Sequence, residues 1–398
     1  MKTPGSLQRV LLYSHDTYGL GHLRRNLSIA RELLNLAKPP LVVLASGSPA
    51  ISRIPLPSGL ATAMLPPVTK TPQGDYRSLE GPLDISLVRR ARSAVLVDVV
   101  ARWKPDVLLV DHSPHGMKGE LLPVFDYVRG TRLATRLVLG LRDILDEPNK
   151  VIDSWTAEGV YSTLEGTYDS VMVYGQRDVF DIGALYKLPM AIADRMEYCG
   201  YVTTPQLATP PLPPSLTDVK RFVLAMIGGG GDGVQVLIDT AVAASFAGIA
   251  CVLCTGPLMS RADRERLDRA TAPLGDVHTV EHLAEPAAVA ARAAAVVTRG
   301  GYNSLCELIG LGVPTIVVPR RAPRLEQVLR ADAFAERGLV ELIDDSTDLR
   351  SALPRLLRSA TSNRSSFRLD LRGAPKAVAH LSRLVNREHD TLLARIPA

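Results

Sequence analysis

The chain has 398 residues, of which 46% are hydrophobic and 5% aromatic, and its formal net charge is +5. This length exceeds one ordinary hydrophobic core, so two domains are expected, and the apolar content excludes a mostly disordered chain. The modest positive charge includes no basic block interleaved with aromatics. It therefore argues against nucleic acid as a partner and suits anionic small molecules or an acidic membrane surface.

No part of the sequence predicts secretion or a membrane span. Residues 1–9 are polar and lead directly into an apolar run, and no stretch has the length of a transmembrane helix. The four cysteines are too few for a disulfide framework. Cys251 and Cys254 lie three apart on an expected strand, so they point to opposite faces, which favours core packing over a metal or redox pair. We expect a protein of the reducing cytoplasm.

In the first half of the chain, short apolar runs alternate with helical patterns. Strands are expected at residues 10–13, 41–45, 105–111, 136–141 and 170–174. Helices are expected at residues 23–36 and 85–103. Continuous apolar strands separated by helices indicate a parallel sheet covered on both faces.

The pattern pauses between residues 202 and 217, where prolines cluster as in an extended linker. It then resumes with strands at 221–227, 249–255, 295–298 and 314–318 and helices at 234–246, 287–293 and 304–311. The predicted fold class is α/β, with two parallel-sheet units. The predicted domains are residues 1–204, a linker at 205–218, residues 219–374, and a C-terminal helix at 375–398, with a return to the N-terminal domain as one option. Ligands of such folds bind at the carboxyl ends of the strands.

The first candidate site is the loop at residues 14–25, which follows a strand and opens a helix. Gly19 and Gly21 allow a tight turn and the close approach of a ligand, and the helix start offers free amides to an anion. His22 lies at this helix start, where it could act as a base near neutral pH. Arg24 and Arg25 add positive charge within one turn. The structural alternative is a tight turn with a capping histidine.

The second candidate site is a run of four glycines, 228–231, at the end of the strand at 221–227. Such a run is entropically costly unless the backbone must bend or admit a ligand. Gly229, Gly230 and Gly231 can form a nest of amides for a phosphate group. The alternative is a flexible turn.

The third candidate site starts where the strand at 295–298 ends and a helix begins. Diphosphate would bind the amides around Gly301 to Ser304, and either Asn303 or Ser304 can cap the helix. Glu307 lies one turn inside the helix, within reach of a sugar hydroxyl. Further on, the carboxylate of Glu326 beside the amide of Gln327 suits bidentate hydrogen bonding of vicinal hydroxyls.

These motifs resemble those of the GT-B glycosyltransferases, in particular the group around the lipid-linked peptidoglycan N-acetylglucosaminyltransferase. The likeness spans both halves and is strongest between residues 278 and 341. The resemblance implies two Rossmann-like domains facing across a cleft. The donor-binding residues that it implies are Gly229, Gly230, Gly231, His282, Leu283, Arg299, Gly300, Gly301, Tyr302, Asn303, Ser304, Glu307, Glu326 and Gln327. Of these, His282 and Leu283 would lie against the base of the nucleotide, and Glu307 would bind its ribose.

On the acceptor side the resemblance aligns His22 with the histidine that ends the family's N-terminal glycine loop. Tyr18 and Leu20 depart from that glycine-rich pattern. We expect His22, Asp111 or Asp143 to be the catalytic base. The other acceptor-side candidates are Gly19, Gly21, Arg24, Arg25, His112 and Arg142. A metal site on Asp111, His112 and His115 is a weaker alternative.

The resemblance implies an inverting, metal-independent hexosyltransferase of polysaccharide biosynthesis. Its donor would be a nucleotide diphosphate sugar, with uridine favoured, and its acceptor a hydroxyl of a glycan, a lipid-linked sugar or a small molecule. No cofactor and no metal is expected. The helix at 85–103, with Arg89, Arg90 and Arg92, would either be a solvated face or contact a membrane, so the location is cytoplasmic with the inner membrane face as an option.

Three other functions fit the same motifs. A nucleotide-sugar hydrolase would use water in place of the acceptor. A nucleotide-sugar 2-epimerase would need acidic residues at the sugar's C2, and the pair Glu326 and Gln327 favours transfer instead. A non-catalytic glycan- or nucleotide-binding protein would bind without turnover.

Overall fold

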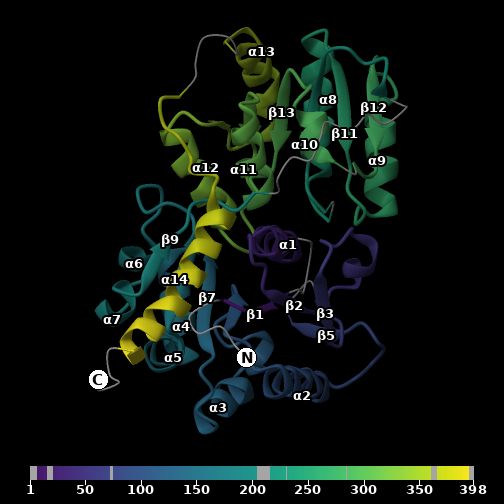
Figure 1. Ribbon diagram of the computed structural model, residues 1–398. Helices are drawn as coiled ribbons and strands as arrows, with labels where there is room; N and C mark the ends of the chain where they lie inside the picture. The colour runs from purple at the N-terminus through teal and green to yellow at the C-terminus, as the bar shows by residue number, and fades with distance from the viewer. Residues whose placement is uncertain are drawn as a thin grey trace. The chain divides into compact units, whose positions relative to one another are not determined.

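The computed structural model describes residues 7–15, 21–71, 75–203, 216–229, 231–283, 285–359 and 365–393. It divides into two compact units, one formed by Met1–Thr204 with Arg372–Ala398 and the other by Pro205–Leu371 (Figure 1). Most of the proline-rich linker predicted at 205–218 lies outside the described residues.

The N-terminal unit is built on a seven-stranded parallel sheet with the order β3-β2-β1-β6-β7-β8-β9. The strands are β1 (Arg9–Tyr13), β2 (Leu41–Ser46), β3 (Leu60–Met64), β6 (Val107–Asp111), β7 (Arg136–Arg142), β8 (Ser170–Tyr174) and β9 (Met196–Tyr198). A separate antiparallel pair joins β4 (Val68–Lys70) to β5 (Tyr76–Ser78). The central strands β6 and β8 are buried along their whole length, which is why their sequences are continuous apolar runs.

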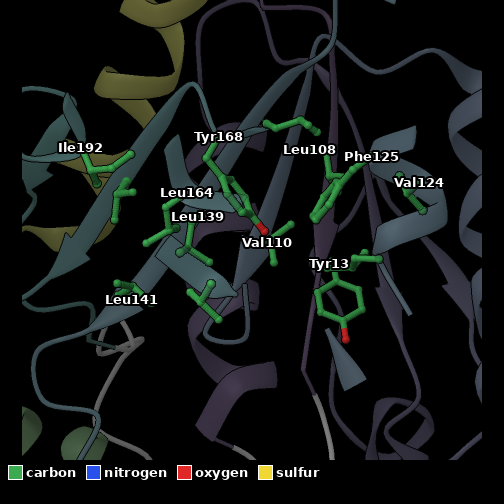
Figure 2. Close-up of a cluster of buried hydrophobic side chains, with 14 of the residues drawn as sticks. Tyr13, Leu108, Val110, Val124, Phe125, Leu139, Leu141, Leu164, Tyr168 and Ile192 are labelled. Atoms are coloured by element: carbon green, nitrogen blue, oxygen red, sulfur yellow. The ribbon is translucent and has the colours of Figure 1, made fainter. Parts of the chain in front are cut away.

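Helices cover this sheet. They are α1 (Gly21–Leu34), α2 (Ile85–Trp103), α3 (Leu122–Gly130), α4 (Pro148–Ala157), α5 (Val160–Thr167), α6 (Ile182–Leu185), α7 (Met190–Ala193) and α14 (Gly373–Leu393). The last of them, drawn in yellow in Figure 1, returns to the N-terminal unit and packs against α1. Figure 2 shows part of the core, in which Phe125 and Tyr168 pack edge to face beside aliphatic side chains of β6 and β7.

The C-terminal unit has a six-stranded parallel sheet with the order β12-β11-β10-β13-β14-β15. Its strands are β10 (Phe222–Met226), β11 (Ala250–Cys254), β12 (Val277–Val280), β13 (Ala295–Thr298), β14 (Thr315–Val317) and β15 (Glu341–Leu342). Its helices are α8 (Val234–Phe246), α9 (Arg261–Thr271), α10 (Pro286–Ala290), α11 (Tyr302–Leu311), α12 (Glu326–Glu336) and α13 (Leu349–Ser359). Separate hydrophobic clusters cover the two faces of the sheet. Cys251 belongs to one and Cys254 packs against the other, which confirms the prediction of opposite faces.

The central strands lie within a residue or two of their predicted bounds, but the sheets extend further than the sequence analysis indicated. The missed strands are the edge strands β3, β9, β12 and β15. Their side chains are partly or fully exposed, so they lack the continuous apolar run that marks a buried strand. Among the described residues, no helix has both the length and the apolarity needed to cross a membrane.

The fold gives a test at Gly140 on β7. A Cβ atom there would lie 2.2 Å from the hydroxyl oxygen of Tyr174, a fully buried residue on the adjacent strand. We expect Gly140→Ala to lower the free energy of unfolding by about 1–3 kcal/mol, because the core must shift to admit the methyl group. Urea denaturation measures this difference.

The matched control is Gly166→Ala in α5, where a Cβ atom meets nothing within 4 Å. This change should be neutral or stabilise by up to about 1 kcal/mol, since alanine favours the helix. A Gly140→Ala protein as stable as the control would contradict the described packing of Tyr174.

Candidate active site

The residues singled out in the sequence gather at the carboxyl edges of two sheets with the same topology. In each sheet the strand order reverses beside the first strand, between β1 and β6 and between β10 and β13. In open parallel sheets the connections diverge at this point and leave a crevice that binds ligands.

In the N-terminal unit, His22 and Asp111 form a hydrogen-bonded pair. His22 is the second residue of α1 and Asp111 the last residue of β6, and their Nδ1 and Oδ2 atoms are 2.5 Å apart. Arg25, one turn further along α1, donates to the other carboxylate oxygen from Nε at 2.9 Å and Nη2 at 2.6 Å. The Arg25 guanidinium also lies over the ring of Tyr174, 5.3 Å from its centroid.

The charges around this pair determine which nitrogen of His22 carries the proton. Burial works to raise the pKa of Asp111, but Arg25 and His22 outweigh it and lower the pKa to about 2. The carboxylate is therefore charged at neutral pH and can only accept hydrogen bonds, so its 2.5 Å contact requires the proton on Nδ1 of His22. Nη2 of Arg25, 3.0 Å from the same nitrogen, then donates to Asp111 at 2.6 Å instead. The lone pair then resides on Nε2, the nitrogen that can take up a proton.

Burial also lowers the pKa of His22 from its usual 6.5, and the charges of Arg25 and Arg142 act in the same direction, while Asp111 opposes them. A neutral imidazole whose Nδ1–H is held by a carboxylate has the arrangement of a general base.

Two further histidines, His15 and His112, surround His22. The ring centroid of His22 lies 6.1 Å from that of His15 and 4.9 Å from that of His112. His15 lies between the hydroxyls of Tyr13 and Tyr76, each 3.3 Å from one of its ring nitrogens. Burial, followed by the charges of His22 and others, holds the pKa of His15 well below 6.5. The sequence analysis did not single out His15 or Tyr76; the position of His15 just past the end of β1 was the available signal.

The other acceptor-side candidates differ in accessibility. Gly19 lies outside the described residues, Gly21 begins α1, and Arg24 is half-buried. Arg25 is only 2% exposed and paired with Asp111, so the expectation that it offers its charge to a ligand is wrong. Its role is to hold Asp111.

The two remaining candidates follow β7. Asp143 is buried and accepts a hydrogen bond from the amide of Ile144 at 2.8 Å. It packs closely against Gly175, since a Cβ atom added to Gly175 would lie 2.8 Å from the Cβ atom of Asp143. Arg142 is half-buried and near enough to His22 to affect its pKa. His22 is thus better placed as a base than Asp143.

The alternative interpretation of this region was a metal site formed by Asp111, His112 and His115. His115 instead has its Nε2 atom 2.8 Å from the hydroxyl of Thr163. Within the ranges that the structure describes, no group of three or more His, Cys, Asp or Glu side chains is arranged to hold a metal ion.

In the C-terminal unit, the glycine loop after β10 is held in place by its neighbours. Gly228 and Gly233 have φ of 77° and 96°, which favour glycine. The amide of Leu258 donates to the carbonyl of Gly229 at 2.8 Å, and a Cβ on Gly256 would lie 2.5 Å from the carbonyl oxygen of Gly228. The loop after β11 therefore packs directly on the glycine loop. Gly229 and Gly231 are exposed, and Gly230 lies outside the described residues.

Helix α11 starts shortly after β13 and has no side-chain cap. Gly300 has φ of 89°, and Gly301 is the N-cap residue without any side-chain cap. The prediction that Asn303 or Ser304 caps the helix is wrong, since both lie inside its first turn. The amides of this first turn have no acceptor within the helix, so together with the helix dipole they form an anion-binding position.

Charged side chains surround this helix start. Arg299 has its Nη2 atom 3.5 Å from Asp232, and burial, with the nearby charge of Arg320, lowers its pKa. Buried Arg330 of α12 donates to the carbonyl of Gly300 at 3.3 Å and lies over the ring of Tyr302. Glu307 is half-buried on the second turn of α11.

The pair Glu326 and Gln327 opens α12, next to the same loop. A Cβ on Gly300 would lie 3.4 Å from the carbonyl oxygen of Gln327. His282 and Leu283 were expected to contact the nucleobase. The side chain of His282 is exposed, whereas that of Leu283 is part of the core. Only the backbone of Leu283 is left to meet a ligand.

Known proteins resemble this chain in its C-terminal unit and in its fold. Residues 229–379 match the model of the glycosyltransferase family 28 C-terminal domain. A curated relative, the UDP-N-acetylglucosamine--N-acetylmuramyl-(pentapeptide) pyrophosphoryl-undecaprenol N-acetylglucosamine transferase of Shouchella clausii (strain KSM-K16), is 26% identical over 97 residues, which are 23% of this chain. The match spans only about a quarter (27%) of that relative's length.

Solved structures resemble the whole chain. A glycosyltransferase of kitacinnamycin is 17% identical with a TM-score of 0.57 and full coverage of both chains. The calicheamicin glycosyltransferase CalG4 is 16% identical with a TM-score of 0.56, covering 98% of this chain and all of the other. TcCGT1, solved in complex with UDP, is 15% identical with a TM-score of 0.61, covering 96% of this chain and 95% of the other.

A prediction follows from the charges around His22. Because Arg142 lowers the pKa of His22 and Asp111 raises it, Arg142→Met should raise that pKa and Asp111→Asn should lower it. Titration of the His22 ring by NMR measures both. A shift of the two variants in the same direction, or a wild-type pKa above 6.5, would contradict the arrangement described.

At identities below 25%, the structural similarities establish the fold. The chain has the GT-B fold, and its residues 229–379 are similar to the glycosyltransferase family 28 C-terminal domain.

Proposed function

We propose that the protein is a glycosyltransferase that moves a sugar from a nucleotide diphosphate sugar to a hydroxyl acceptor. The observation that carries the proposal is the uncapped start of α11 after Gly300 and Gly301, inside the family 28 match. It supplies backbone amides and dipole charge for a diphosphate, and the glycine loop after β10 belongs to the same sheet edge.

The donor half of the reaction is the departure of a nucleoside diphosphate. Negative charge grows on the leaving oxygen as its bond to the anomeric carbon breaks. The first-turn amides of α11 and the guanidinium of Arg299 would stabilise that charge, which is the basis for proposing metal independence. Uracil is the proposed base of the donor nucleotide, because a structural relative was solved with UDP and the curated relative is named for a UDP-sugar.

The acceptor half needs a base. In the proposed reaction Nε2 of His22 takes the proton of the acceptor hydroxyl while its oxygen attacks the anomeric carbon. Asp111 fixes the tautomer and offsets the imidazolium charge that develops, and Arg25 holds Asp111. One direct displacement of this kind inverts the anomeric configuration.

Part of the N-terminal unit suggests how a lipid-linked acceptor could be reached. Leu79 and Leu83, which precede α2, and Leu87 in its first turn are 46%, 46% and 51% exposed, and Arg90 of the same helix is exposed as well. Arg92, by contrast, is buried in an ion pair with Glu120 and cannot serve a membrane face as considered above. We propose that these three leucines contact anionic lipid.

If they do, the double variant Leu83→Ser/Leu87→Ser should co-sediment less with anionic vesicles than the wild type. Unchanged co-sedimentation would contradict the proposed lipid contact.

The nucleotide site can be tested at Gly301. This residue has an ordinary φ of −63°, and a Cβ there meets nothing within 4 Å, so alanine or valine should fold normally. If diphosphate binds these amides, Gly301→Val should weaken UDP binding at least tenfold by steric block.

Thermal shift and calorimetry with UDP, ADP and GDP provide the measurement. Wild-type protein at 100 times the dissociation constant of UDP should gain roughly 2.7 kcal/mol of stability. Gly275→Ala, another open glycine, is the control and should bind UDP like wild type. Equal binding by the Gly301→Val and Gly275→Ala variants would refute the assigned diphosphate site.

The base is tested by His22→Ala. Turnover should fall by about a hundredfold or more, with UDP affinity unchanged, because the base acts in the chemical step. His278→Ala is the control; His278 is half-buried on the edge strand β12, with its Nε2 atom 3.3 Å from Asp276.

Assays should follow both the glycosylated product and free sugar. Donor consumption that releases free sugar regardless of any acceptor would indicate a hydrolase. Full activity in the His22→Ala variant would remove His22 from the role of base.

A further inference from the structure

Arg320 contacts both side chains of the Glu326–Gln327 pair. It lies three residues past the end of β14 and is half-buried. Its backbone amide donates to Oε1 of Gln327 at 3.2 Å, and its Nη2 donates to Oε1 of Glu326 at 3.4 Å.

These two contacts fix which atoms of the pair remain available. A backbone N–H can only donate, so the Gln327 atom that faces it must be the oxygen, and the side-chain amide nitrogen is directed elsewhere. In Glu326, Oε1 is taken and Oε2 has no hydrogen-bond partner among the described residues, although the side chain is only 8% exposed.

A shielded carboxylate oxygen without a partner is unfavourable, and native proteins normally provide such an atom with a donor. The remaining groups are therefore one acceptor, Oε2 of Glu326, and one donor, Nε2 of Gln327, on consecutive residues. Two neighbouring hydroxyls match this arrangement, since one can donate to the carboxylate while the next accepts from the amide.

The position of the pair agrees with such a ligand. Gln327 lies against Gly300, and Arg330 from the same helix donates to the Gly300 carbonyl. The pair is thus adjacent to the glycines at the start of α11, where the diphosphate is proposed to bind. A sugar joined to that diphosphate would be next to the pair.

We infer that Arg320 is a positioning residue of the donor-sugar subsite, which orients Glu326 and Gln327 to read an uncharged vicinal diol. The inference rests on the proposed function and adds to it the residue that orients the expected sugar-binding pair. A carboxylate on the sugar at this position would be repelled by Glu326, so the diol lies on a neutral part of the donor.

The adjacent arginine provides a matched control. Arg321 has the same chemistry but is 56% exposed and paired with Asp344, away from Glu326. Arg320→Met removes the guanidinium and keeps the backbone amide, so the Glu326 contact is lost and the Gln327 contact stays. Arg321→Met removes a guanidinium of the same size without touching the pair.

The test measures, by calorimetry on the full chain, the affinities of UDP, UDP-glucose and the 2-, 3-, 4- and 6-deoxy analogues of UDP-glucose. In the wild type, loss of either of two adjacent hydroxyls should weaken binding about tenfold, since a polar group of the pair is left unpaired. In Arg320→Met the penalty for the hydroxyl read by Glu326 should shrink to about twofold and that for the hydroxyl read by Gln327 should remain, while UDP alone binds within twofold of wild type. Arg320→Lys should restore part of the selectivity, and Arg321→Met should behave as wild type.

The outcomes separate this inference from the proposed function. If the wild type does not bind UDP, both fail. If it binds UDP but no adjacent pair of hydroxyls stands out, or Arg320→Met keeps the full penalties, the role of Arg320 is refuted and the nucleotide site stands. Equal loss of UDP and UDP-glucose affinity in Arg320→Met, with an unchanged melting temperature, would also refute it.

Discussion

The proposed donor site depends on the first-turn backbone amides of α11, which have no acceptor within their own helix. They exist because Gly300 adopts a positive φ and Gly301 supplies no side-chain cap. The reversal of strand order between β10 and β13 leaves room for a ligand at that edge. Arg299, Arg330 and the Glu326–Gln327 pair are arranged around this one feature, so the donor chemistry proposed here follows from the backbone N–H groups of the helix start more than from any single side chain.

The N-terminal unit relies on a different principle, the pairing of buried charges. Asp111 is held by Arg25 and His22, and Glu120 is held by Arg92 and Tyr13. Removing one partner of such a pair is costly because the other charge stays buried. This rigidity keeps the tautomer of His22 defined. It also explains why arginines that look like surface charges in the sequence, Arg25 and Arg92, are internal.

Much of this arrangement could be predicted because its signals are local. The central strands are apolar runs, and the glycines after β10 and β13 mark turns that other residues cannot make. What the sequence could not show depends on distant contacts. The pairing of His22 with Asp111 spans 89 positions, the exposed edge strands have no apolar signature, and Arg320 looks like any other residue in an arginine-rich loop until its contacts with Glu326 and Gln327 are known.

The most direct test of the central claim is a crystal structure of the full chain with UDP bound. The account predicts diphosphate oxygens at roughly 3 Å from the first-turn amides of α11, Tyr302 to Ser304, with the glycine loop after β10 close by. UDP bound elsewhere, or these amides occupied by side chains while calorimetry shows no binding of any nucleoside diphosphate, would contradict it.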